Sequence, residues 1–151
     1  MIARFAFATI LVVALLAPPS ASAAQRIKAK AWRAVKTYDM QTLQKVEPLP
    51  LRQVVALRFN YRQRDIRHLK PNWFYSSIWS ANPSGELNSV PVMVSKADLA
   101  AFQRLPADPS SGGKFTVYGQ VLRDADANYI FLRLLGTKVK RDARGNATVS
   151  W

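Results

Sequence analysis

Polar and apolar residues alternate along residues 53–64, which read QVVALRFNYRQR. Val55, Leu57, Phe59 and Tyr61 share one face at a period of two, and the other face carries mostly arginine and polar side chains. This alternation is typical of a β-strand that is buried on one side only. We therefore expect a strand whose apolar face contributes to a core and whose opposite face is basic.

Four more segments have the composition of strands, and clusters of turn-forming residues separate them. Pro91 predicts an edge strand or a bulged strand, because proline lacks the N–H that a central ladder needs. Gly119 and Gly136 predict bends within the later strands. The four segments are 73–81, 89–94, 114–124 and 128–140, and a short final turn and strand are expected within 141–151.

A short helix is expected between the third and fourth strands. Ser95 can cap its start, Leu99, Phe102 and Leu105 follow at helical spacing, and Pro106 ends it. The order is therefore three strands, one helix and two strands. Over residues 51–140 this order, with a glycine bend in a late strand, resembles the OB-fold, a five-stranded β-barrel. A mainly β domain of open, sandwich-like architecture is the alternative.

Residues 24–50 differ from this domain, which we place at 51–151. Apolar side chains at helical spacing predict an amphipathic helix over 25–40, and Pro48 and Pro50 mark a linker. The apolar arc contains Ile27, Ala31, Ala34, Val35 and Tyr38, whereas Lys28, Lys30, Arg33 and Lys36 lie outside it. Such a helix can lie on an anionic membrane or pack against its own domain.

The first 23 residues follow the order of a secretory signal peptide. Arg4 precedes an apolar run at 5–17, and small residues then lead to Ala21-x-Ala23. The run is shorter than the roughly 20 residues of a membrane span. We therefore expect cleavage after Ala23 and a periplasmic or secreted protein, and the lack of cysteine excludes a lipoprotein anchor.

The chain is strongly basic, with 22 Lys and Arg against 9 Asp and Glu and a formal net charge of +13. Loss of Arg4 with the signal peptide leaves +12. This excess favours partners such as anionic polymers or membrane surfaces. The absence of cysteine excludes disulfides and thiolate metal sites, and a single histidine excludes a multi-histidine metal centre. No cofactor is indicated.

The OB-fold resemblance implies a ligand face on the second and third strands, beside the loop that joins strands one and two. Rings at 73, 75 and 79 could stack on bases or sugars there, provided that the odd-numbered residues face outward; otherwise they are core and Phe74 and Ile78 face outward. The candidate ligand-binding residues are Arg58, Arg62, Arg64, Arg67, His68, Lys70, Trp73, Tyr75 and Trp79.

These observations predict an exported, non-catalytic binding module for an anionic or sugar-like envelope partner, and a protein partner also fits. One alternative is an envelope structural protein held on the membrane by the 25–40 helix. The other is a single-stranded nucleic-acid binding protein. Export disfavours nucleic acid, as do Asp124 and Asp126 at the opposite rim, which would repel a polyanion.

An enzymatic role has little support in the sequence. Asp65 and His68 could form a hydrolase pair if DIRH makes a helical turn, but no strand–turn–helix nucleophile elbow is found. We therefore expect no catalytic site, and we expect His68 to be a solvated loop residue.

Overall fold

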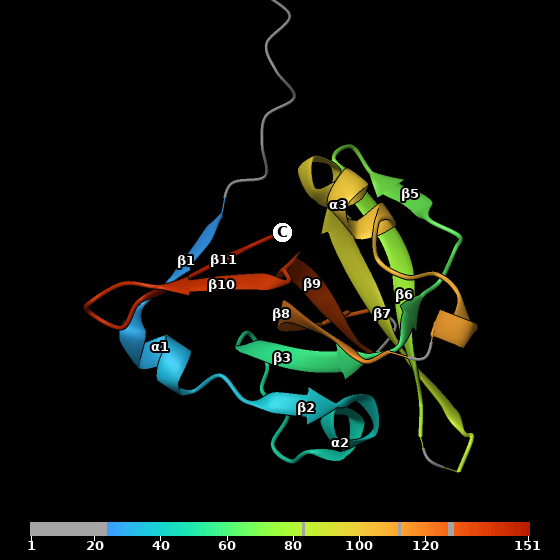
Figure 1. The fold of residues 1–151 in the computed structure, drawn as a ribbon, viewed down its shortest axis with the longest axis horizontal. Coiled ribbons are helices and arrows are strands. Elements are labelled where there is room, and N and C mark those ends of the chain that lie inside the picture. The colour runs from blue at the N-terminus through green and yellow to red at the C-terminus, as the bar shows by residue number, and fades with distance from the viewer. Residues whose placement is uncertain (1–23, 83, 112, 127–128) are drawn as a thin grey trace, which may run out of the picture.

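The computed structural model describes residues 24–151 except 83, 112 and 127–128, so the predicted signal peptide at 1–23 lies outside the described residues. The fold is mainly β, as the sequence predicts (Figure 1). Within the described residues, no helix is long and apolar enough to span a membrane. The strands are β1 (Gln25–Ile27), β2 (Thr37–Asp39), β3 (Val54–Phe59), β4 (Tyr61–Arg62), β5 (Arg67–Lys70), β6 (Trp73–Ala81), β7 (Leu87–Ser95), β8 (Phe115–Arg123), β9 (Ile130–Gly136), β10 (Lys138–Arg141) and β11 (Ala147–Ser150). The helices are α1 (Ala29–Arg33), α2 (Met40–Lys45) and α3 (Leu99–Gln103), with 3₁₀ turns at Lys96–Asp98 and Pro109–Ser111.

The larger sheet contains the strands that the sequence predicts at 53–64, 73–81, 89–94 and 114–124. The single strand predicted at 128–140 is wrong, because it divides at Gly136 into β9 of this sheet and β10 of the smaller sheet, and the predicted connection before β6 contains the strand β5. Its strands follow the order β2-β3-β8-β9-β7-β6-β4, and β5 pairs with β6. β7 and β9 are parallel and β2 is parallel to β3, whereas the other pairs are antiparallel. The register shifts between Tyr118 and Gly119, which confirms the predicted irregularity there. The prediction that Pro91 lies in an edge or bulged strand is wrong, because β7 lies between β6 and β9 and pairs with β6 without a register shift. β7 pairs with β9 only at Val92 and Met93, so Pro91 lies just outside that second ladder and its missing N–H is tolerated.

The inner face of this sheet holds the main core. Leu57, Phe59, Ile78 and Val117 are 0% exposed, and Phe102 of α3 is equally buried among them. The start of the helical segment is as predicted, since Ser95 Oγ accepts a hydrogen bond from the backbone N–H of Asp98 at 3.2 Å. α3 therefore contributes to the same core as the strands on either side of it in the sequence.

The predicted helix over 25–40 is wrong. Residues 25–27 form β1 against β11, residues 29–33 form the single short helix α1, and residues 37–39 form β2 beside β3. The apolar residues do recur at helical spacing, but only over a few turns. The backbone of residues 25–27 pairs instead with a strand more than a hundred residues away in the sequence. Met40 and Leu43 of the following helix α2 belong to the main core. Segment 24–50 is thus built into the β domain.

A second, three-stranded sheet has the order β1-β11-β10 and forms an arm at one side of the molecule (Figure 1). Gly136, with φ of 151°, lies where β9 of the first sheet leads into β10 of the second. The predicted bend at Gly136 is thereby confirmed. Ile27, Leu135 and Val149 form a smaller apolar cluster under this sheet, and Trp32 packs against it.

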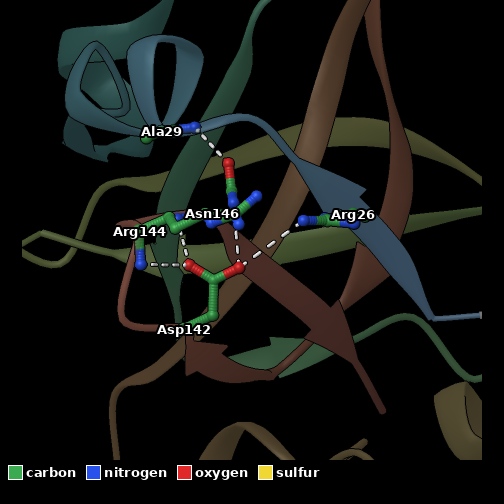
Figure 2. A network of polar contacts seen from close by, with 5 residues as sticks. All are labelled: Arg26, Ala29, Asp142, Arg144 and Asn146. Atoms are coloured by element: carbon green, nitrogen blue, oxygen red, sulfur yellow. Dashed lines mark hydrogen bonds and ion pairs between the residues drawn. The ribbon is translucent and has the colours of Figure 1, made fainter.

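Polar contacts tie the turn between β10 and β11 to the N-terminal segment (Figure 2). The Asp142 carboxylate accepts hydrogen bonds from the backbone N–H groups of Arg144 and Asn146 and lies 3.5 Å from a guanidinium nitrogen of Arg26. Asn146 Oδ1 accepts the N–H of Ala29 at 3.0 Å, at the start of α1. The hydrogen bond that the Asn146 side chain donates to the Asp142 carboxylate is the main reason why the pKa of Asp142 is lowered. The carboxylate's stabilising effect is therefore present at neutral pH and fades as pH falls through that lowered pKa.

Replacing Leu43 with Ala tests whether segment 24–50 is part of the folded domain. Leu43 is 0% exposed, so we expect Leu43→Ala to lower the free energy of unfolding by about 2–5 kcal/mol. Urea denaturation measures this change, and exposed Thr42→Ala in the same helix should stay within about 0.5 kcal/mol. Equal stability of the two variants would show that α2 does not pack in the core.

Replacing Gly136 with Ala tests the junction of the two sheets. A Cβ at Gly136 would overlap the backbone carbonyl of Ser150. We expect Gly136→Ala to destabilise the fold by about 1–3 kcal/mol in urea denaturation, since overpacking shifts backbone atoms.

Gly85→Ala is the matched control for this variant. Gly85 also has a positive φ, 82°, but a Cβ there meets nothing within 4 Å. The control therefore reports the conformational cost alone, about 1 kcal/mol. If the two alanine variants lose the same stability, close contact at Gly136 does not hold the junction.

Candidate functional site: the outer face of β6

The register of β6 decides which of its side chains face outward. Ser76 and Ile78 are 2% and 0% exposed and point into the core. Successive side chains alternate between faces, so Trp73, Tyr75 and Trp79 lie on the outer face, where each is half-buried. The sequence left two registers open, and the structure has the one in which the odd-numbered rings are outward.

Tyr75 is part of a row of side chains that crosses several strands on this outer face. Arg67 of β5 lies opposite Tyr75, and Met93 of β7 lies opposite it on the other side. Arg133 of β9 is in turn aligned with Met93, and Gln120 of β8 with Arg133. The row therefore places an aromatic ring and a thioether between two arginines. Met93 and Arg133 were missed by the sequence analysis, because only strand pairing brings them beside β6.

Tyr129 borders the same face from the loop that joins β8 to β9. Burial raises the pKa of its hydroxyl, and the charges of Asp124 and Tyr75 raise it further. The backbone N–H of Asp124 donates to the carbonyl of Tyr129 at 2.9 Å and closes the base of this loop. Tyr129 was also missed by the sequence analysis.

A bend at Asn60 changes which side of the strand faces the core. The Asn60 side chain accepts hydrogen bonds from Ser80 Oγ and the Ala81 N–H, at 3.0 and 3.1 Å, and donates to the carbonyl of Gly113 at 2.9 Å. Phe59 is buried, but Tyr61 is paired with Trp79 and stacks on it with ring centroids 6.4 Å apart and planes at 6°. The prediction that Tyr61 is a core residue is therefore wrong, and it belongs to the outer face.

We call Tyr61, Trp73, Tyr75, Trp79 and Tyr129 the aromatic face. The stack of Tyr61 on Trp79 holds these two rings at one end of β6. Arg67 and Lys70 of β5 flank the rings nearer the other end, opposite Tyr75 and Trp73. Both of these cations are exposed. The arrangement combines apolar rings with exposed positive charges, and this combination suits the stacking of flat groups that carry negative charge nearby.

Arg62 has an internal role that the sequence pattern did not indicate. It is aligned with buried Ile78, on the core side of the sheet. Its guanidinium donates to the backbone carbonyls of Gln103, the last residue of α3, and of Leu105, at 2.7 and 3.2 Å, and lies 5.7 Å from the centre of the Phe102 ring. Burial lowers the pKa of Arg62, with a smaller effect from the positive charge of Arg64. The predicted basic face of Arg58, Arg62 and Arg64 is therefore wrong at its central member.

The remaining candidate residues lie on different parts of the surface. Arg58 is exposed on β3, aligned with Asp39 and Thr116, and β3 is not a neighbour of β6 in the main ladder. Arg64 is exposed in the segment after β4. His68 is exposed and contacts the edge of Phe74 with ring centroids 5.3 Å apart. Because Phe74 has the parity of the core residues, His68 lies on the opposite side of the strand from Arg67 and Tyr75.

The structure lacks the helical turn that an Asp65–His68 pair requires. Residues 63–66 are irregular, and His68 lies within the extended strand β5. The backbone carbonyl of Asp65 instead accepts a hydrogen bond from Ser76 Oγ at 3.0 Å. Throughout the part of the chain that the structure describes, no group of three or more His, Cys, Asp or Glu residues is arranged to hold a metal ion.

Comparison with known proteins places this chain in no family. No protein-family model matches the sequence, and no curated protein matches it. One structural match is a crystal structure assigned to an aspartyl-tRNA synthetase of Leishmania major Friedlin, with a TM-score of 0.42 and 14% sequence identity. The alignment covers 82% of this chain and 22% of the synthetase chain, so the protein spans about a fifth of that length. A likeness this distant carries no argument about activity or partners.

Replacing Arg62 with Met tests its internal role, because Met keeps an apolar stem over Phe102 but leaves the two carbonyls without their donor. We expect Arg62→Met to lower the free energy of unfolding by about 1–3 kcal/mol in urea denaturation. Arg64→Met is the matched control, and we expect a change within about 0.5 kcal/mol because Arg64 is exposed. Equal effects in the two variants would contradict the assignment.

Proposed function

We propose that the protein is an exported, non-catalytic binding module that engages an anionic or sugar-like polymer of the cell envelope through its aromatic face. The observation that carries this proposal is the outward register of Trp73, Tyr75 and Trp79, with Arg67 directly opposite Tyr75. Had these rings been core, no platform for stacking would exist on this strand.

The chemistry of such a face follows from its two kinds of group. Aromatic rings offer flat apolar surfaces to sugars and bases, and stacking on one ring contributes about 1–3 kcal/mol per base in nucleic-acid complexes. Arg67, Lys70 and Arg133 supply positive charge on the same side of the sheet. Because the Tyr61–Trp79 stack already orders two of the rings, little conformational entropy is lost when a ligand packs on them.

The finer fold that we propose is the five-stranded OB-like barrel. Its first strand would be residues 54–62, which comprise β3 and β4 with only Asn60 between them, followed by β6, β7, β8 and β9. The proposal is supported by pairing at both ends of this segment, since β3 pairs with β8 while β4 pairs with β6. The parallel pair of β7 and β9 is consistent with it. In such a barrel the aromatic face would occupy the position where OB-folds commonly bind ligands.

The membrane-surface alternative has less support. It relied on a continuous amphipathic helix over 25–40, and residues 25–27 and 37–39 are strands. Deleting 25–47 would also remove Met40 and Leu43 from the core, so loss of membrane association after that deletion would report unfolding. Single-stranded nucleic acid remains an alternative ligand of the same face, because bases also stack on aromatic rings.

Binding assays on four immobilised ligands test the proposal: cell-wall glycan fragments, an anionic polysaccharide, single-stranded DNA and anionic liposomes. We expect binding to one of the first two, weakened about tenfold or more in the Tyr75→Ala and Arg67→Ala proteins. For a polyanion, Arg67→Ala should also reduce the slope of log affinity against log salt by about one.

Arg58→Ala is the matched control, since Arg58 is equally exposed but is aligned with Asp39 of β2 and Thr116 of β8 and not with a residue of the aromatic face. Its affinity should equal that of the unmodified protein at every salt concentration. Equal losses in Arg58→Ala and Arg67→Ala would reduce the interaction to net charge and overturn the proposed face. Tighter binding to DNA than to either glycan would assign the face to nucleic acid instead.

A further inference from the structure

A cleft of about 500 Å³ separates α1 from the start of β3. Its walls are apolar and small: Ile27 and Val54 on one side, and on the other Ala31 of α1 and Ala34, the residue that follows α1. Ile27 is buried, whereas both alanines are exposed. Where a helix packs tightly on a sheet, larger side chains fill the space between them. Here, alanines on the facing side of α1 leave an open space of a size typical of small-molecule sites.

Among the described residues that line this cleft, three are cations, namely Lys28, Lys30 and Arg52, and the remaining polar side chain is that of Gln53. No acidic residue is among the described residues that line it. All three cations are exposed. An apolar interior with positive charge at its edge is complementary to a molecule that has an apolar chain and an anionic end.

The walls of the cleft are held in place before any ligand binds. Asn146 anchors the first residue of α1, and Asp142 draws Arg26 of β1 towards the same turn (Figure 2). On the other wall, the N–H of Arg52 donates to Val121 at 2.6 Å and its carbonyl accepts from Gln120 Nε2 at 3.0 Å. These bonds from β8 hold Arg52 at φ of 62°, a left-handed conformation that glycine would adopt more easily. A strained position is thus occupied by a residue whose side chain carries a charge at the cleft.

We propose that this cleft binds an aliphatic carboxylate, with the hydrocarbon chain between α1 and Val54 and the carboxylate among Lys28, Lys30 and Arg52. The site is independent of the aromatic face, because no residue is common to the two. The apolar walls supply the burial of the chain, and Arg52 supplies a guanidinium whose planar donors match the geometry of a carboxylate.

Isothermal titration calorimetry of the purified protein with sodium decanoate, below its micelle concentration, tests the proposal. We expect saturable binding of one decanoate per protein. Ala31→Phe fills the cleft from an exposed helix position and should weaken binding about tenfold or more. Arg52→Gln should weaken it several-fold through loss of the charge, and Lys45→Gln, an exposed lysine on α2 outside the cleft, should leave it unchanged.

Two further ligands and a fold check make the result decisive. Decanol has the same chain without the charge and should bind more weakly than decanoate; equal affinity would overturn the role of the cations. Tighter binding of decyl phosphate would overturn the assignment of the head group to a carboxylate. Amide NMR spectra must show that Ala31→Phe and Arg52→Gln remain folded. Absence of saturable decanoate binding, or unchanged binding in folded Ala31→Phe, would overturn the site.

Discussion

The fold depends on the hydrogen bonds that Asn60 makes at the centre of segment 54–62. Before this residue the strand pairs with β8, and after it the strand pairs with β6. The backbone N–H of Asn60 also donates to the carbonyl of Trp79, and its side chain holds Ser80 and Ala81. One residue therefore joins two parts of the sheet and reverses which side chains face the core. Phe59, before this reversal, faces the core, and the half-buried Tyr61–Trp79 stack, after it, faces outward.

Much of the β structure could be predicted because its signals are local. Alternation, turn residues and the Ser95 cap depend on near neighbours in sequence. The first four predicted strands and the capped helical segment lie where these signals are, whereas the fifth predicted strand divides into β9 and β10. The prediction of a helix over 25–40 is wrong for the opposite reason, namely that the structure of this segment depends on residues distant in the sequence. Ile27 is aligned with Ala147, a partner that no local pattern reveals, and strand pairing overrides a helical spacing only a few turns long.

The candidate site could be predicted only in part, for the same physical reason. The rings of β6 and the flanking Arg67 and Lys70 are near one another in the sequence and remain together in the structure. Arg62 departs from the pattern because the bend at Asn60 turns it inward, where its charge satisfies carbonyls at and just beyond the end of α3. Met93, Arg133 and Tyr129 could not be foreseen, since only the pairing of β6, β7 and β9 and the loop before β9 bring them to the face.

The pairing of β1 with β11 has a consequence for the order in which the protein acquires its structure. Residues 25–27 can meet their partners only after residues 147–149 have been synthesised. Until then Ile27 has neither its strand partner Ala147 nor its core neighbour Val149, so the smaller sheet cannot form. The larger sheet does not need these residues and can assemble first. Contacts this distant in sequence close slowly, because the loop between them must first be ordered. We therefore expect the arm to form after the larger sheet, because it needs residues from both ends of the described chain.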